Sequence, residues 1–333
     1  MAERTTMPTS EWPIDLTDVE SARDRIAPYL SITPLRSYRA LDATIRHGIR
    51  VFVKHENHHP TNAFKVRNAF AALTALTAAH GSRGVIAATR GNHGQGLAYA
   101  GQVLGIPVTI CVPHGNNPEK NEAMIGYGAE LVEEGNDYDE SLVAVVRLQR
   151  ERGLVPIHGT NNAQVLAGAG TITLELLQQV EALDAIVIAI GGGSQAVGAL
   201  TVSRALRPDV AVYGVQAAGA PAIYESWKAG EMRVLDSANT FADGIATRSA
   251  YEMTFPALKS GLAGFVTVTD AEIAEALRLL LRTTHTLVEG AGAAGLAGLI
   301  KLRNELDGKR VAIILSGGNI DAATLRKVMT EQI

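Results

Sequence analysis

The stretch Ala63-Phe64-Lys65-Val66-Arg67-Asn68-Ala69 places a lone lysine between an aromatic residue and small residues, at the start of a long apolar segment. Upstream, residues 51–54 read as a short strand, and the Pro- and Asn-containing residues 57–62 read as a turn. Lys65 is therefore expected at a strand-to-helix transition, where α/β proteins commonly place their chemistry. This position favours an anchoring role for Lys65, with a solvated lysine at a helix start as the ordinary alternative.

The composition describes a globular chain with no electrostatic sign of a nucleic-acid partner. Of 333 residues, 47% are hydrophobic and 19% are charged, and the formal net charge is -4. Such a chain can bury substantial cores and is expected to form about two domains. No basic run is interleaved with aromatic residues, so DNA and RNA are not expected partners.

Compartment signals favour the cytoplasm. Cys111 is the only cysteine, which excludes an intrachain disulfide and a thiolate metal cluster and fits a reducing compartment. Residues 1–13 carry Pro, Ser, Glu and Trp where a signal peptide needs an apolar core. No apolar stretch reaches the roughly 18 residues of a membrane span, so we expect no membrane insertion.

Short apolar runs alternate with longer amphipathic segments along the chain. This pattern predicts an α/β fold with parallel sheets and helical crossovers. Expected strands lie at residues 85–88, 108–112, 130–133, 185–190, 210–216, 265–269 and 311–316. Expected helices lie near residues 92–104, 119–127, 137–151, 163–180, 270–284 and 321–331, and one long irregular region covers about residues 230–264.

A glycine run follows the predicted strand at residues 185–190. It reads Gly191-Gly192-Gly193-Ser194, and a helical pattern begins directly after it. Glycine N–H groups, the Ser194 hydroxyl and the start of a helix would suit a phosphate. The spacing matches neither GxGxxG nor GxxxxGK[ST], and a turn that binds nothing is the alternative.

Two further polar, glycine-rich loops follow predicted strands. Thr89-Arg90-Gly91-Asn92-His93-Gly94-Gln95 offers hydroxyl, amide and helix N-terminal donors suited to a carboxylate, although Asn92 could simply cap a helix. The third loop is Leu315-Ser316-Gly317-Gly318-Asn319. We expect the three loops and Lys65 to converge on the carboxyl edge of one sheet.

These motifs resemble those of the fold-type II pyridoxal-phosphate enzymes. AFKVRNA at residues 63–69 resembles SFKxRGA, residues 89–95 resemble SxGNHxQ, residues 191–194 resemble the polyglycine phosphate loop, and residues 316–319 resemble SGGN. The motifs follow the family's order and approximate spacing from about residue 34 to the C-terminus. Within the family, the chain looks most like the threonine and serine dehydratases, with serine racemase nearby.

The resemblance implies a tryptophan synthase β-like architecture of two three-layer, open-sheet α/β domains. A large domain of residues 1–83 and 159–333 would bind pyridoxal 5'-phosphate, and a small, mobile domain of residues 84–158 would carry the substrate loop. A homodimer is implied as well. The chain ends about fifteen residues after SGGN, so we expect no C-terminal regulatory domain and no feedback inhibition.

The resemblance also assigns roles to the motif residues. Lys65 would hold the cofactor as a Schiff base and then remove the substrate α-proton. Ser316 would meet the pyridine nitrogen, and because a hydroxyl does not force that nitrogen to be protonated, loss of a β-leaving group is favoured over transamination. The expected cofactor-binding residues are Phe64, Lys65, Asn92 (at the ring 3-oxygen), Gly191, Gly192, Gly193 and Ser194 (at the 5-phosphate), Ser316 and Gly317. The expected substrate-binding residues are Thr89, Arg90, Gly91, Asn92 and His93.

The implied reaction is removal of the β-hydroxyl from a 3-hydroxy amino acid such as threonine or serine, giving a 2-oxo acid and ammonia, as in ammonia-lyases. Three alternatives stay open. The substrate could be a larger or acidic 3-hydroxy amino acid, such as 3-hydroxyaspartate or 3-phenylserine. The enzyme could be a β-replacement synthase, or the chain could be an amino-acid sensor without turnover, against which the retained Lys65 argues.

Several residues depart from the family's pattern. Arg90 stands where racemases place a serine as second base, and a guanidinium cannot accept a proton, so we expect little racemase activity. Arg90 could instead bind a carboxylate or face solvent. Gln216 and Ala222 replace the acids of metal-activated members, so we expect no tight Mg²⁺ or Ca²⁺ site, with a monovalent site left open.

Glu289 and three histidines fall outside these motif roles. Glu289 could orient the ring or the substrate amine, or cap a helix that starts near Ala291. His58, His59 and His93 lack metal-ligand spacing and are treated as loop residues.

Overall fold

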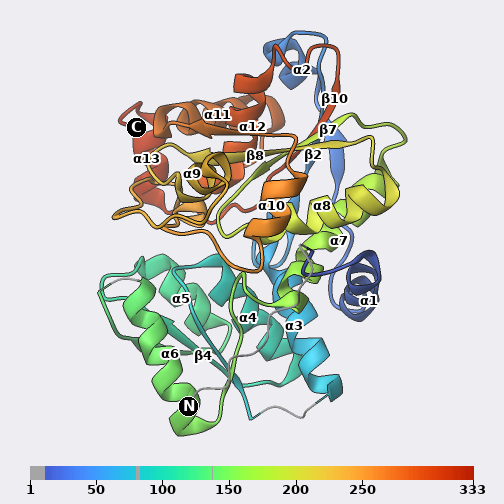
Figure 1. The fold of residues 1–333 in the computed structure, drawn as a ribbon. Helices are drawn as coiled ribbons and strands as arrows, with labels where there is room; N and C mark the ends of the chain where they lie inside the picture. Colours follow the sequence, from blue (N-terminus) through green and yellow to red (C-terminus); the bar gives the residue numbers. More distant parts are fainter. Residues whose placement is uncertain (1–11, 80–82, 137) are drawn as a thin grey trace.

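Two open sheets organise the computed structural model, which describes residues 12–79, 83–136 and 138–333 (Figure 1). In sheet order, the six-stranded sheet contains β1 (Leu35–Ser37), β2 (Arg50–Lys54), β10 (Arg310–Ile314), β7 (Ala185–Ala189), β8 (Ala211–Ala217) and β9 (Gly264–Val268). The four-stranded sheet contains β5 (Glu130–Glu133), β4 (Val108–Val112), β3 (Val85–Ala88) and β6 (Val155–Pro156). Neighbouring strands are parallel except for the antiparallel pair β1 and β2.

Helices bury both faces of the six-stranded sheet. Because side chains alternate along a strand, Val187 packs on one face of β7 while Ile186 and Ile188 pack on the other. The first face is covered by α2 (Arg39–Ile45), α11 (Asp270–Thr284) and α12 (Gly290–Leu302). The second is covered by α7 (Ala163–Gln179), α8 (Ser194–Leu206) and α10 (Phe255–Gly261). Two buried faces explain the continuous apolar runs of these strands.

The four-stranded sheet is also the middle of three layers. One face packs against α3 (Lys65–Ala79), α4 (Asn92–Leu104) and α5 (Pro118–Gly126), and the other against α6 (Tyr138–Arg152). The helices α1 (Leu16–Ile26) and α7 pack on α3 and so join the two halves. At Gly168 of α7 an added Cβ would lie 2.7 Å from the Arg67 carbonyl oxygen, so α7 and α3 approach closely only because this residue is glycine. The remaining elements are η1 (Glu56–His58), α9 (Ala222–Ala229), η2 (Asp243–Ile245) and α13 (Ala322–Met329).

The α/β fold expected from the sequence is confirmed, with corrections in detail. The helices expected at residues 92–104 and 270–284 have those bounds, and all seven strands expected downstream of residue 84 are present within two residues of their predicted ends. The short strands β1 and β6 were missed, and the antiparallel β1 means that the larger sheet is not wholly parallel. All strands of the smaller sheet fall within residues 85–156, but the domain boundaries at 84 and 158 and the mobility of that part stay predictions.

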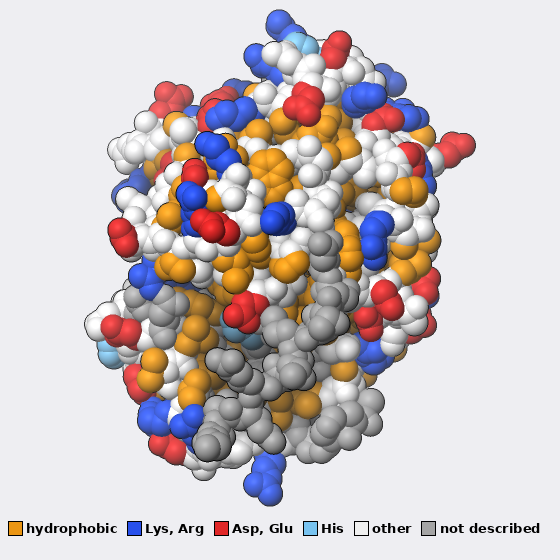
Figure 2. Space-filling model, viewed as in Figure 1, with side chains coloured by type: hydrophobic (Ala, Val, Ile, Leu, Met, Phe, Trp, Pro, Cys, Tyr) orange, Lys and Arg blue, Asp and Glu red, His pale blue; other side chains and the backbone are white. Residues whose placement is uncertain are grey.

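The distribution of charge on the surface and the lengths of the helices bear on nucleic-acid and membrane binding. On the face in Figure 2, Lys and Arg side chains are interspersed with Asp and Glu side chains. None of the described helices combines the length and apolarity needed to cross a membrane. Residues 1–11, which make up most of the segment tested for a signal peptide, lie outside the described residues.

Candidate active site

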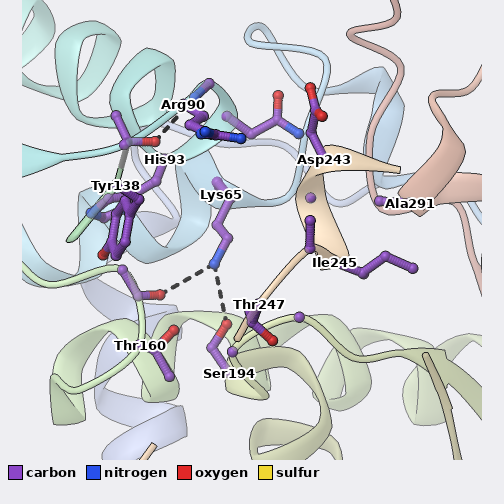
Figure 3. A pocket seen from close by; sticks show the side chains of 18 of the residues that line it. Lys65, Arg90, His93, Tyr138, Thr160, Ser194, Asp243, Ile245, Thr247 and Ala291 are labelled. Atoms are coloured by element: carbon purple, nitrogen blue, oxygen red, sulfur yellow. Dashed lines mark hydrogen bonds between the residues drawn. The ribbon is translucent and has the colours of Figure 1, made fainter. Parts of the chain in front are cut away.

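A cavity of about 380 Å³ lies where loops from both sheets meet (Figure 3). Its wall includes the loop after β3 of the four-stranded sheet, the loops after β7 and β10 of the six-stranded sheet, and the start of α3. The three glycine-rich loops do converge, as expected, but the expectation that they share one sheet edge is wrong. The cavity therefore lies between two sheets.

Lys65 is the first residue of α3 and points into this cavity (Figure 3). Its Nζ donates to the Gly159 carbonyl oxygen at 3.2 Å and to Ser194 Oγ at 3.4 Å. No acidic residue in the described part of the chain forms an ion pair with it. Burial lowers the pKa of Lys65 to about 8, because a charged amine loses hydration there without gaining a counter-charge.

A buried ionic cluster holds the start of α3 in place. Arg67, two residues after Lys65, is fully buried and donates to Glu56 of η1 at 2.7 and 3.0 Å. It also donates to both oxygens of Glu175 in α7 at 2.7 Å, and Lys54 Nζ reaches Glu175 at 2.8 Å. Two cations thus balance two anions, which makes the burial of these charges tolerable. The cluster therefore ties the start of α3 to η1 and to α7.

The glycine loop after β7 is shaped for close approach. Gly193 precedes α8 with φ of +96°, which a residue with a side chain rarely adopts. A Cβ on Gly192 would overlap the Thr160 side chain, and one on Gly191 would overlap the Gly244 carbonyl oxygen. The first N–H groups of α8, beginning at Ser194, have no partner within the helix. This loop, which we call the cradle, therefore offers backbone N–H donors suited to an anion.

The loop after β3 and the start of α4 carry the five residues predicted to bind the substrate. Thr89, Arg90, Gly91, Asn92 and His93 all line the cavity. Thr89 Oγ1 accepts from the Gly91 N–H at 3.1 Å, so this hydroxyl shapes the loop. Arg90 is exposed at the cavity and has no ion pair with any residue that the structure describes (Figure 3).

The His93 ring is held by the backbone. Its Nε2 bonds to the Ile157 carbonyl oxygen at 2.9 Å, and burial, followed by the nearby charge of Lys65, lowers the pKa of His93 to about 3. A neutral imidazole then donates from Nε2, and within the described part of the chain its buried Nδ1 has no partner. The ring therefore supports the loop and does not supply a charge.

The loop after β10 and the Lys65 segment are joined. Phe64 N–H donates to the Ser316 carbonyl oxygen at 3.0 Å, and Ala63 pairs with Gly317 in a β-bridge. Ser316 is buried at the cavity wall, and Phe64 lines the same cavity. The structure thus brings together all the residues predicted for the cofactor, with Gly317 behind the wall.

Several cavity residues had not been predicted. Lys120 of α5 forms an ion pair with Asp243 of η2 at 2.9 Å, and this contact crosses the cavity wall between the two halves. The other unpredicted wall residues include Tyr138, Thr160, Thr247 and Tyr251. The sequence signal for some of them was the region at residues 230–264, predicted to be irregular, since long irregular segments often build binding sites. That prediction is wrong in part, because η2 and α10 lie within this region. Lys120 had no such signal in the sequence, because its partner, Asp243, is 123 residues away.

Gln216 at the end of β8 has a structural use in this chain. It is fully buried, and its Oε1 accepts from the N–H groups of Ile223 and Tyr224 at 3.1 and 3.0 Å. Its Nε2 donates to Thr247 Oγ1 at 3.4 Å. The amide therefore caps α9 and reaches the cavity wall. Within the residues that the structure describes, no three His, Cys, Asp or Glu side chains group as metal ligands.

Comparisons with known proteins agree with this geometry. A family model described as pyridoxal-phosphate dependent enzyme matches residues 26–317. The L-threonine ammonia-lyase of Thermotoga maritima is 35% identical over 320 residues, covering 96% of this chain and 79% of that protein. The L-threo-3-hydroxyaspartate ammonia-lyase of a Pseudomonas species is 36% identical over 304 residues, covering 91% of this chain and 95% of that protein. Among solved structures, maize serine racemase superposes with a TM-score of 0.89 at 31% identity, covering 96% of this chain and 97% of that chain.

Proposed function

The chain belongs to the family of pyridoxal-phosphate-dependent enzymes, and from this premise we propose that it removes the 3-hydroxyl group from a 3-hydroxy amino acid such as threonine or serine, releasing a 2-oxo acid and ammonia. One observation carries the proposal. Lys65 presents an amine without an acidic partner, among the described residues, to a cavity that also contains an anion cradle. The relatives of this chain include ammonia-lyases that, by their names, act on threonine and on 3-hydroxyaspartate.

The cavity residues fit pyridoxal 5'-phosphate. The amine of Lys65 would carry the cofactor, and the cradle at residues 191–194 would hold its phosphate, because the N–H groups at the start of α8 have no partners within the helix. Ser316 would offer a neutral hydroxyl to the ring. When bound, the cofactor supplies an electron-accepting ring that stabilises negative charge at the substrate α-carbon.

Lys65 would move the proton at that carbon. The pKa of Lys65, about 8, lies close to neutral pH, and a base with such a pKa can accept a proton and return it efficiently. An uncharged amine in a desolvated site is also the better nucleophile. The backbone N–H groups at the start of α4, beginning with Asn92, would orient the substrate carboxylate, since they have no partners within the helix.

Arg90 bears on both racemisation and substrate choice. A guanidinium stays protonated and cannot act as the second base that racemisation needs. An arginine at the cavity, without an ion pair among the described residues, can bind a carboxylate with two hydrogen bonds. This observation favours 3-hydroxyaspartate as a second candidate substrate.

The test is 2-oxo acid formation by the holoenzyme from threonine, serine, 3-hydroxyaspartate and 3-phenylserine. We expect turnover of at least one of them, loss of it in Lys65→Ala, and conversion of L-serine to D-serine far slower than deamination. Racemisation as fast as deamination would contradict the role given to Arg90. Product only after a thiol is added would indicate a β-replacement synthase, and binding without any product would indicate a sensor.

The sequence also predicts a homodimer and a cytoplasmic location, which we keep as part of this proposal. Sedimentation velocity of the holoenzyme and cell fractionation would test them.

A further inference from the structure

Glu289 does not cap the helix that follows it. It occupies the N-cap position of α12, yet its side chain makes no capping hydrogen bond. Its Oε1 instead accepts from Asn92 Nδ2 at 2.6 Å, across 197 residues of sequence. The side chain is buried and lines the main cavity. Helix capping therefore does not explain Glu289, and its buried carboxyl must have another role.

The amide of Asn92 is held at both ends. Its Oδ1 accepts from Asn319 Nδ2 at 2.8 Å, and one N–H of its Nδ2 goes to Glu289. These two contacts fix which end of the amide is oxygen and which is nitrogen. The second N–H of Nδ2 is left for a group in the cavity, which Asn92 lines.

We propose that Glu289 is a positioning residue, whose carboxyl fixes the Asn92 amide so that its second N–H serves the cofactor. The inference deepens the proposed function, because it rests on a cofactor in this cavity. It assigns Glu289 no direct contact with substrate.

Glycine at position 317 makes room for this pair. A Cβ there would overlap Glu289 Oε1 and lie 3.2 Å from Asn92 Nδ2. Any larger residue would push the carboxyl and the amide apart. Gly317 was predicted as a cofactor-binding residue, and this contact offers a reason for glycine that does not require it to touch the cofactor.

Charged groups face Glu289 from several elements. Lys120 of α5 and Asp243 of η2 pair with each other beside it, and Asp321 precedes α13 in the wall of a second, smaller cavity that Glu289 also lines. Lys65 and Arg90 line the main cavity. Burial raises the pKa of Glu289 to about 7, and Asp243 adds to the rise, while Lys120 and the Asn92 hydrogen bond oppose it. The carboxyl therefore changes charge near neutral pH.

The consequence has a definite direction. Above its pKa the carboxylate accepts strongly from Asn92, and below it the neutral carboxyl accepts more weakly. The hold on Asn92 should thus tighten as the pH rises through about 7.

The experiment compares Glu289→Gln, Glu289→Ala and wild type, with Glu119→Gln on the exposed start of α5 as the matched control. Cofactor affinity is measured by equilibrium dialysis, and the visible absorbance of the holoenzyme is followed as a function of pH. Glutamine can still accept from Asn92 but cannot ionise. We expect Glu289→Gln to bind the cofactor but to lose the wild-type change in affinity and absorbance near neutral pH. Glu289→Ala should weaken cofactor binding about tenfold, because a hydrogen bond to a charged group is lost.

The outcomes separate this inference from the proposed function. The inference is overturned if Glu289→Gln keeps the wild-type pH dependence, or if Glu289→Ala lowers only the melting temperature and leaves cofactor affinity unchanged. Gly317→Ala should reproduce the loss of affinity, and wild-type affinity there would count against the inference. A holoenzyme that shows the expected spectra but yields no 2-oxo acid would instead refute the proposed function alone.

Discussion

Lys54 and Lys65 are two lysines with buried amines that should respond in opposite ways to the same substitution. Lys54 is paired with Glu175 at 2.8 Å, whereas Lys65 has no acidic partner in the described part of the chain. Replacing Lys65 by methionine should make the cofactor-free protein more stable at neutral pH while it abolishes activity. Replacing Lys54 by methionine should make it much less stable.

The size of the Lys65 effect follows from its pKa. A fall from 10.5 to about 8 corresponds to about 3 kcal/mol at about 1.4 kcal/mol per unit. Taking this value as the upper bound, we expect Lys65→Met to raise the free energy of unfolding by about 1–3 kcal/mol. Because the unfolded chain binds the proton more strongly, the wild-type penalty is complete below about pH 8 and disappears as the pH rises through 10.5.

The Lys54 effect has the opposite sign. Removing that cation leaves the buried cluster with two carboxylates, Glu56 and Glu175, against the one guanidinium of Arg67, and an uncompensated buried charge typically costs about 3–5 kcal/mol. Urea unfolding of the three cofactor-free proteins at about pH 7 and about pH 10 measures both effects. The reasoning is refuted if Lys65→Met is less stable than wild type near neutrality, or if its advantage is the same at both pH values.

Three further perturbations test other parts of the site. Gly192→Ala places a methyl group on the Thr160 side chain, so cofactor affinity in equilibrium dialysis should fall by about tenfold or more. Gly126→Ala, whose Cβ meets no atom within 4 Å, should leave it unchanged, and equal affinities would argue against the cradle. Arg67→Met should lower the free energy of unfolding in urea by about 3–5 kcal/mol, because it removes the guanidinium that bonds both buried carboxylates, Glu56 and Glu175, and a loss below about 1 kcal/mol would contradict the cluster. Chelation of divalent metal ions should leave activity unchanged, since the Gln216 amide oxygen accepts from two N–H groups of α9 and is not an anionic metal ligand. A loss of activity restored by Mg²⁺ alone would contradict this.

Local patterns in the sequence were sufficient for elements with strong signals of their own. The bounds predicted for α11 agree with the structure, in which Thr269 and Glu272 form a capping box ahead of an amphipathic run. The strand β1 was missed because its three residues are too few to show an alternation, and its antiparallel pairing leaves no trace in composition.

The grouping of strands into sheets was not readable. The strands β3 and β7 are both short apolar runs buried on both faces, yet they belong to different sheets. Neither run contains a signal that identifies its neighbouring strands. The sequence therefore could not show that the three glycine-rich loops lie on two different sheets. The loops nevertheless converge on one cavity, because the loop after β3 of the smaller sheet lies opposite the loops after β7 and β10 of the larger sheet.

Contacts between distant residues were likewise hidden. The sequence leaves two roles open for Glu289, and only its contact with Asn92 in the fold separates them. The pairing of Lys120 with Asp243 has no local signature in either segment. Arg90 could be singled out from its loop, whereas its exposure at the cavity required the fold.

The most direct test of the central claim is to find which residue carries the cofactor. Borohydride reduction of the holoenzyme fixes a cofactor bound to a lysine amine, and peptide mass mapping then locates it. The account predicts the added mass on the peptide containing Lys65 and its absence in Lys65→Ala. Attachment to any other lysine, or a purified protein that takes up no cofactor, would contradict it.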